Sequence, residues 1–263
     1  MRRLIEKIAI FLFQHNLKGR GRFCDFFKLK SITFKNKFNV VMELDPNEYI
    51  DREVISKGYY EEEVVEQLIK AIESSSEPRE VFWDIGANIG LHCLTLSSLY
   101  PKVVHYAFEP FYHNFSKLMI NHELNSCSVT LFNFGLSDEF GVHQLYTTQK
   151  NSGRSGFIDM EAALKTSVNI LSCDGDFLVS QGIALPPTMI KLDVEGWEGN
   201  VLQGCSDILQ STCLHTIIFE GARNASEIAF IEDLERMGFS VSPIKRQIQN
   251  FEENENYIAV RKA

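Results

Sequence analysis

No pair of cysteines in this sequence stands in a pattern typical of a zinc site or a disulfide framework. The six cysteines are scattered, with no Cys-x-x-Cys pair and no histidine at zinc-ligand spacing. No run of about 20 apolar residues occurs, so we expect no transmembrane helix. Internal repeats, low-complexity tracts and Pro- or Gly-rich linkers are also missing. What remains is a globular composition, with 44% hydrophobic and 23% charged residues, and we expect a reduced, cytoplasmic α/β protein.

Charge is distributed unevenly along the chain. The net charge is −9, but residues 1–37 carry +8 and the remaining residues carry −17. Such an acidic body excludes a nucleic-acid-binding surface there, so any anionic partner would contact the N-terminal segment. We expect residues 1–57 to form a basic N-terminal extension with a helix and a strand-like segment, in front of a domain over residues 58–263.

The first residues are basic and then apolar, as in a signal peptide. The uncharged run over residues 8–13 is too short for the hydrophobic region of such a peptide, and no cleavage site with small residues follows it. One helical face collects the apolar side chains Leu4, Ile5, Ile8, Phe11 and Leu12. We expect this face to pack on the body or on a partner, with peripheral contact to an anionic membrane as the alternative.

From about residue 60, strand-like and helix-like stretches alternate. This order predicts a mostly parallel sheet with helices on both faces. The last two strand-like stretches form a terminal hairpin, so we expect a seven-stranded, Rossmann-like sheet whose last strand is antiparallel. The expected strands cover residues 81–83, 103–108, 129–132, 189–193, 216–220, 239–241 and 256–260.

The loop after the first expected strand has the residues of a cofactor-binding turn. Gly86 and Gly90 allow a sharp backbone turn close to a ligand, and the amides at the start of the following helix favour polar or anionic groups. Asp84, at the strand end, suits a ligand with a cationic amino group but would repel the pyrophosphate of NAD. These features favour S-adenosylmethionine, with a glycine turn that serves only helix–strand packing as the alternative.

Glu109 ends the second expected strand, 25 residues after Asp84. An acidic side chain at this point can accept hydrogen bonds from both ribose hydroxyls of an adenosine. Its alternative role is to place a negative charge at the start of the helix that Pro110 opens. The ribose role is favoured because the loop and the acid occur together.

Five segments together resemble the FkbM family of S-adenosylmethionine-dependent methyltransferases. They are residues 82–90, residues 107–110 with Asn114, residues 135–138, residues 256–260 and, most specifically, residues 190–198. The resemblance covers roughly residues 58–261, and it implies a class I methyltransferase fold that transfers a methyl group to a hydroxyl of a small molecule, sugar or glycan unit. The residues to which it assigns contact with S-adenosylmethionine are Asp84, Gly86, Ala87, Asn88, Gly90, Glu109, Pro110, Ser137 and Asp138.

Four polar residues near the fourth and fifth strands are candidates for catalysis. Lys191 and Asp193 share a strand face. Glu195 lies in the loop beyond, and Glu220 ends the neighbouring strand. We hypothesise that Asp193 borders the methyl group or the acceptor and that Glu195 or Glu220 accepts or orients the acceptor proton. Alternatively, Lys191 and one carboxylate form a structural ion pair. We predict no metal site, although the three carboxylates could instead bind a divalent cation through their oxygen atoms.

Two other classes of function fit parts of the sequence. An NAD-linked oxidoreductase shares the acidic strand end, but its loop would read Gly-x-Gly-x-x-Gly, and Asn88 occupies the place of the middle glycine. A non-catalytic binding protein with this fold would usually have lost the loop, the acid or the fourth-strand motif. Tyr59, Tyr60 and Glu61 could cover the cofactor as a lid or pack in the core. The identity of the acceptor and the oligomeric state stay open.

Overall fold

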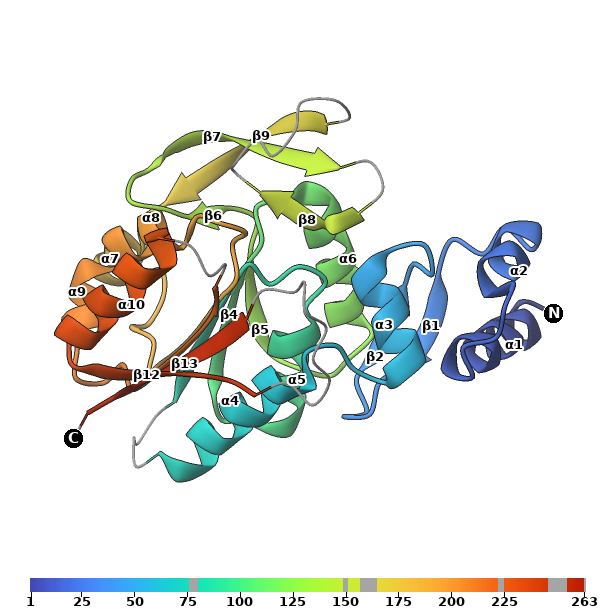
Figure 1. The fold of residues 1–263 in the computed structure, drawn as a ribbon, viewed down its shortest axis with the longest axis horizontal. Coiled ribbons are helices and arrows are strands. Elements are labelled where there is room, and N and C mark those ends of the chain that lie inside the picture. Colours follow the sequence, from blue (N-terminus) through green and yellow to red (C-terminus); the bar gives the residue numbers. More distant parts are fainter. Residues whose placement is uncertain (76–79, 149–150, 157–164, 222–224, 246–254, 263) are drawn as a thin grey trace.

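The computed structural model describes the chain except for residues 76–79, 149–150, 157–164, 222–224, 246–254 and 263 (Figure 1). Its central strands are β3 (Val81–Ile85), β4 (Val104–Phe108), β5 (Val129–Phe132), β10 (Met189–Leu192), β11 (Thr216–Gly221), β12 (Phe239–Pro243) and β13 (Glu255–Arg261). They form one seven-stranded sheet in the order β12-β13-β11-β10-β3-β4-β5. The last strand, β13, is antiparallel to its neighbours β11 and β12, and the other adjacent pairs are parallel. The predicted Rossmann-like fold with an antiparallel last strand is therefore confirmed.

Helices cover both faces of this sheet because its buried strands alternate their side chains. Phe82 of β3 joins one apolar core, whereas Trp83 and Ile85 of the same strand join another. The first core contains side chains of α4 (Glu62–Ser74), α5 (Leu91–Leu99) and α6 (Tyr112–Glu123). The second contains side chains of α7 (Gly175–Ser180), α8 (Glu198–Gln203), α9 (Ser206–Gln210) and α10 (Ala225–Arg236). With both faces covered, the loops that follow the parallel strands are left as the place for a ligand.

A second, smaller sheet lies above the central sheet in the view of Figure 1. Its strands are β6 (Gly135–Leu136), β7 (Gly141–Thr148), β8 (Asn151–Gly156) and β9 (Lys165–Cys173), in the order β6-β9-β7-β8. Leu145 and Ile170 of this sheet pack with Phe111 in a small core of their own. This sheet is not among the elements predicted from the sequence, because β9 consists largely of polar and small residues and lacks the apolar run of a central strand.

Residues 1–57 form α1 (Arg2–Gln14), α2 (Arg20–Phe26), a hairpin of β1 (Ile32–Lys35) and β2 (Val41–Leu44), and α3 (Tyr49–Lys57). The hairpin contacts α6 and the turn that follows it through two asparagines. Oδ1 of Asn121 accepts from the backbone N–H of Glu43 at 2.7 Å, and the side chain of Asn125 bonds the N–H and the carbonyl of Val41 at 2.9 and 2.7 Å. This segment therefore packs on the body, and the domain boundary near residue 57 stays a prediction.

Helix α1 packs through a face that differs in part from the predicted one. Ala9 and Phe13 are buried in the first core, whereas Leu4, Ile8 and Phe11 are exposed. Of the predicted face, Ile5 packs against this core, so the expectation that this face packs on the body holds only in part. Packing of Leu4, Ile8 and Phe11 on a partner stays a prediction. No helix in the described part of the chain is long and apolar enough to cross a bilayer.

Candidate active site

The loop between β3 and α5 approaches the end of β10 very closely. Gly86, Asn88 and Gly90 have positive φ angles of 82°, 50° and 86°. A side chain at Gly86 would collide with the carbonyl oxygen of Asp193, which directly follows β10. Glycine is therefore required at this position both by the backbone conformation and by the lack of space. As a result, the loop and the end of β10 form adjoining parts of one wall.

Glu109 follows β4, and two backbone amides hold its carboxylate. The N–H of Asn88 donates to Oε2 and the N–H of Phe111 donates to Oε1, both at 2.8 Å. The residue is only 5% exposed, and this burial raises its pKa to about 7, although the two amides favour the charged form. Glu109 is thus a fixed acceptor of hydrogen bonds, provided that it is ionised.

Asp84 lies beneath the loop rather than beside the pocket. It is fully buried, and its Oδ2 accepts from the backbone N–H of Cys93 in the first turn of α5 at 3.1 Å. Its Oδ1 lies 3.9 Å from Nζ of Lys191. A carboxylate at the start of a helix is favourable, so Asp84 supports the loop from behind. Direct contact between Asp84 and a cofactor stays a prediction.

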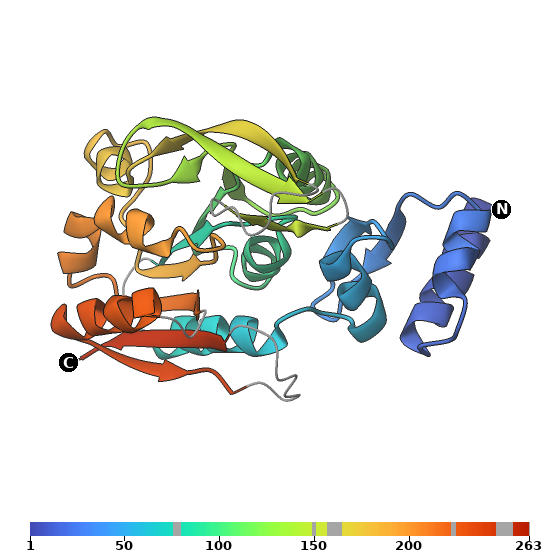
Figure 2. The ribbon, with the colours of Figure 1, turned by 45° about the horizontal axis from the view of Figure 1, so that its top comes forward.

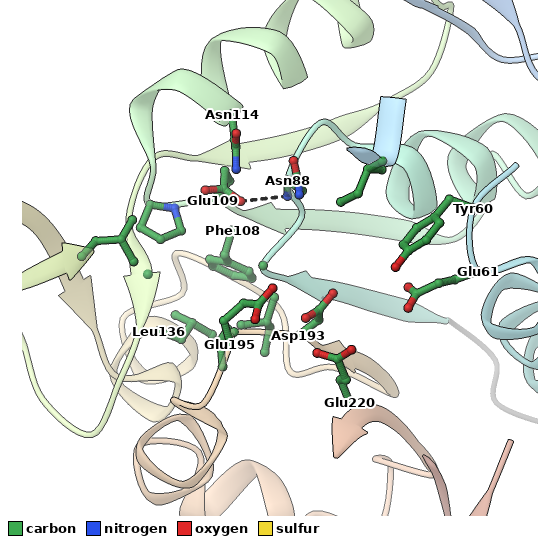
Figure 3. A pocket seen from close by; sticks show the side chains of 17 residues that line it. Tyr60, Glu61, Asn88, Phe108, Glu109, Asn114, Leu136, Asp193, Glu195 and Glu220 are labelled. Atoms are coloured by element: carbon green, nitrogen blue, oxygen red, sulfur yellow. Dashed lines mark hydrogen bonds between the residues drawn. The ribbon is translucent and has the colours of Figure 1, made fainter. Parts of the chain in front are cut away.

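One pocket collects many of the predicted site residues (Figure 3). The predicted residues that line it are Gly86, Asn88, Glu109, Pro110, Asp193, Glu195 and Glu220. Those outside the lining are Asp84, Ala87, Gly90, Ser137, Asp138 and Lys191. The structure therefore brings the three candidate catalytic carboxylates and part of the cofactor loop to one cavity.

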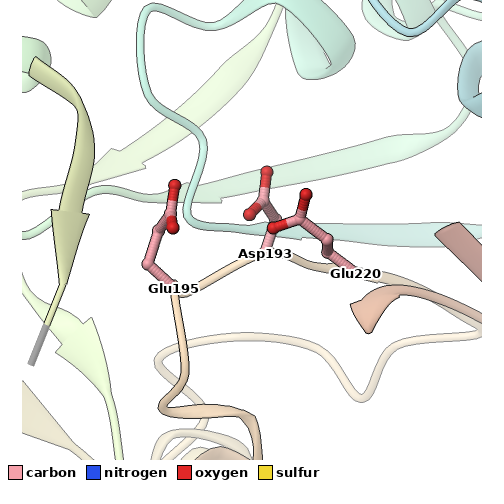
Figure 4. Close-up of side chains that lie close together, drawn as sticks. All are labelled: Asp193, Glu195 and Glu220. Atoms are coloured by element: carbon pink, nitrogen blue, oxygen red, sulfur yellow. The ribbon is translucent and has the colours of Figure 1, made fainter. Parts of the chain in front are cut away.

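Asp193, Glu195 and Glu220 converge from two neighbouring strand ends (Figure 4). Each is half-buried, and one carboxylate oxygen from each lies within 4.8 Å of the other two. Glu195 has a positive φ of 52°, a costly conformation for a residue with a side chain. The loop after β10 thus holds Glu195 in place at an energetic cost, which is typical of functional sites.

Lys191 compensates part of this negative charge from behind the pocket. Its Nζ lies 3.0 Å from Oδ2 of Asp193 and 3.9 Å from Oδ1 of Asp84. Burial by itself would lower the pKa of Lys191, but the charges of Asp193, Asp84 and Glu61 raise it above its usual value. Lys191 therefore stays protonated. Its ammonium also opposes a second cation beside Asp193.

Tyr60 and Glu61, in the turn before α4, line the pocket, whereas Tyr59 is buried in the core. Glu61 has a positive φ of 54°. Its Oε1 accepts from Nδ2 of Asn256 at 3.2 Å, and its Oε2 lies 3.6 Å from Nε2 of His92. Burial opposes its charge, but the hydrogen bond from His92 and the charge of Lys191 outweigh this effect and lower the pKa of Glu61 to about 2. Glu61 is therefore a further anionic group at the pocket.

Ser137 and Asp138 connect two segments beside the pocket instead of lining it. The indole N–H of Trp197 donates to Oγ of Ser137 at 3.1 Å, and Oγ of Ser137 donates to Oδ1 of Asp138 at 2.8 Å. Nδ2 of Asn200 donates to the same oxygen of Asp138 at 3.3 Å. These bonds join the strand β6 to the start of α8. A contact of Ser137 or Asp138 with adenine stays a prediction.

Several lining residues were not among the predicted site residues. Phe108, Leu136 and Leu145 supply apolar surface, Ile50 comes from α3, and Asn114 lies near Glu109. Phe108 could have been predicted as a pocket residue from the sequence, because it directly precedes Glu109 at a strand end. Nothing in the sequence indicates that Ile50 and Leu145 line the pocket, since they come from the N-terminal segment and from the unpredicted second sheet.

The chain is similar to known methyltransferases. The family model described as Methyltransferase FkbM domain matches residues 84–241. Hexuronic acid methyltransferase AglP from Haloferax volcanii is 31% identical over a match that covers 56% of this chain and 58% of AglP. 31-O-demethyl-FK506 methyltransferase FkbM from Streptomyces tacrolimicus is 28% identical, with 49% of this chain and 61% of that protein covered. The matches thus span less than two thirds of these relatives.

Solved structures share the fold at low sequence identity. The methyltransferase FkbM from Methylobacillus flagellatus has a TM-score of 0.50 and 16% identity over 69% of this chain and 43% of its own. A SAM-dependent methyltransferase from Agrobacterium tumefaciens has a TM-score of 0.52 and 8% identity over 89% of this chain and 71% of its own. Both likenesses agree with the class I methyltransferase architecture of the central sheet.

Proposed function

Since the chain belongs to the FkbM methyltransferase family, we propose that it methylates a hydroxyl group of a small molecule, sugar or glycan unit. Membership of this family implies S-adenosylmethionine as the methyl donor. The observation that carries the proposal is a single pocket with Glu109 held by backbone amides on one side and Asp193, Glu195 and Glu220 on the other.

The residues of the pocket fit this cofactor. Glu109 offers two carboxylate oxygens to ribose hydroxyls, and Phe108 and Leu136 offer apolar surface to an adenine ring. Gly86 leaves the loop without a side chain where it borders the pocket. When bound, S-adenosylmethionine supplies an electrophilic methyl group. The chain then needs to align an acceptor oxygen with that methyl group and exclude water.

The three converging carboxylates are suited to receive the acceptor proton. Oδ2 of Asp193 already accepts a hydrogen bond from Nζ of Lys191 at 3.0 Å, so this carboxylate is engaged on one side. We therefore assign Asp193 to orienting the acceptor hydroxyl, and Glu195 or Glu220 to taking its proton as the methyl group is transferred. General base catalysis of this kind typically contributes about 10²–10⁴ in rate.

The charge of the pocket favours a neutral acceptor. Five carboxylates line it, those of Glu61, Glu109, Asp193, Glu195 and Glu220, and no Lys, Arg or His is among the lining residues that the structure describes. A cationic methyl donor suits such a surface, whereas an anionic acceptor would be repelled. The relative AglP acts on a hexuronic acid, as its name states. For this chain we propose a neutral sugar or polyol instead.

Calorimetry and a transfer assay test the two parts of this proposal. We expect S-adenosylhomocysteine to bind and NADH not to bind, and binding of NADH alone would overturn the methyltransferase assignment. With methyl-labelled S-adenosylmethionine, we expect labelling of neutral hydroxylated acceptors in preference to matched uronic acids. Preferential labelling of the uronic acids would refute the neutral-acceptor proposal while leaving the reaction class intact.

A further inference from the structure

One face of α1 serves neither the fold nor the proposed active site. Leu4, Ile8 and Phe11 are 63%, 40% and 53% exposed. At 100° per residue, these three positions lie within about 60° of one another around the helix. The buried residues Ala9 and Phe13 lie on the opposite side. The three apolar side chains therefore form a stripe that points away from the body of the protein.

Basic residues border this apolar stripe. Arg3 and Lys7 are exposed on one flank of it. Other exposed basic residues on the following turn, on α2 and on the segment after it are Lys18, Arg22, Lys28 and Lys30. Figure 2 shows α1 and α2 at one end of the molecule, remote from the central sheet. Because residues 1–37 carry +8 and the remainder −17, an anionic surface would attract this end and repel the rest.

We propose that α1 binds peripherally to an anionic lipid bilayer. Leu4, Ile8 and Phe11 enter the boundary between headgroups and acyl chains, and Arg3 and Lys7 contact lipid phosphates. An apolar stripe flanked by basic side chains is the pattern of helices that lie in the membrane interface. A nucleic acid would satisfy the basic residues but leave the stripe in water. A symmetric contact between two copies would bring together two N-terminal segments that each carry +8 over residues 1–37, which is unfavourable.

Vesicle sedimentation of the full chain tests this proposal. We expect binding to vesicles of phosphatidylcholine mixed with phosphatidylglycerol, and much weaker binding to phosphatidylcholine alone. A combined Leu4→Gln, Ile8→Gln and Phe11→Gln variant removes the stripe and keeps residues that favour a helix. We expect its partition coefficient to fall by about tenfold or more, since three apolar side chains no longer enter the bilayer.

A matched control comes from three exposed apolar residues of the body. Leu99, Ile183 and Met237 are 40%, 47% and 39% exposed, and their combined replacement by Gln should leave vesicle binding unchanged. The pair Arg3→Glu and Lys7→Glu should weaken binding to the anionic vesicles only, as added salt does. Circular dichroism reports whether each variant is folded.

Three results would overturn the proposal. The first is wild-type protein that does not sediment with anionic vesicles. The second is a stripe variant that binds as well as the control variant. The third is a wild-type protein that does not bind vesicles and is a dimer, which the stripe substitutions convert to a monomer. The stripe would then be an interface between copies of the chain.

Discussion

The two sides of the pocket hold their carboxylates by different means. Backbone N–H groups of Asn88 and Phe111 fix Glu109, so its position depends on main-chain geometry and little on neighbouring side chains. Asp193 is instead held by the side chain of Lys191, and Glu195 has a positive φ angle in the loop after β10. The difference teaches that the position of the cofactor-side carboxylate depends on main-chain geometry, whereas the acceptor side depends on a side-chain ion pair and on one turn with a positive φ angle.

Substitution at Gly86 would break the cofactor side and has the largest expected effect. In Gly86→Ala, the new methyl group collides with the carbonyl oxygen of Asp193, and the residue also keeps a φ of 82°. We expect loss of detectable methyl transfer and destabilisation by about 3 kcal/mol or more, from overpacking and backbone strain together. A transfer assay with methyl-labelled S-adenosylmethionine and urea unfolding measure these two effects.

The control for this experiment is Gly182→Ala. Gly182 also has a positive φ, of 66°, but open space surrounds the position of the added methyl group. The free energy of unfolding of Gly182→Ala should therefore fall by only about 1 kcal/mol, because the left-handed conformation alone opposes the substitution. Equal losses of unfolding free energy in Gly86→Ala and Gly182→Ala would show that the close approach of Gly86 to Asp193 does not contribute to stability.

Replacing the bases on the acceptor side should separate catalysis from cofactor binding. The double variant Glu195→Gln and Glu220→Gln should lower kcat by about 10²–10⁴, because no carboxylate is left to take the acceptor proton, apart from Asp193, which is paired with Lys191. Its affinity for S-adenosylhomocysteine should stay near that of the wild type. Glu123→Gln, at an exposed position on α6, is the matched control. A double variant with normal kcat would remove the catalytic role of both residues.

Acidity should affect the cofactor side through Glu109. Its folded-state pKa of about 7 lies above the ordinary value of 4.5, so this group stabilises the fold below pH 4.5, and its contribution is lost as the pH rises through 7. Ribose hydroxyls need the ionised carboxylate, so affinity for S-adenosylhomocysteine should rise about tenfold from pH 6 to pH 8. Glu109→Gln should bind more weakly and abolish this dependence. A pH dependence that survives in Glu109→Gln would assign it to another group.

Metal removal is expected to have the smallest effect. The carboxylates of Asp193, Glu195 and Glu220 are close enough to share a cation, but the ammonium of Lys191 already lies 3.0 Å from Asp193. We therefore expect activity to be unchanged after exhaustive chelation. Loss of activity that added Mg²⁺ restores would show instead that the acceptor side is a metal site.

The sequence predicted those parts of the molecule that depend on local pattern. Strand-end acids such as Glu109 and positive-φ glycines such as Gly86 could be located because their chemistry is tied to fixed positions in a parallel sheet. The second sheet could not be located, since β9 packs only a few side chains, among them Ile170, in a small core. Which face of α1 packs was also beyond the sequence, because both faces are apolar and only tertiary contacts decide between them.

The position of β13 has a consequence for the order of folding. This strand follows β12 in the chain but lies between β11 and β12 in the sheet, so β12 cannot join the sheet before β13 has been synthesised. Until then, the nascent chain exposes an unpaired edge of β11, which is a hazard for aggregation on the ribosome. Asn256 of β13 also donates to Glu61, 195 residues earlier in the chain. The side of the pocket that holds Glu61 therefore gains this contact only after the last strand of the sheet is in place.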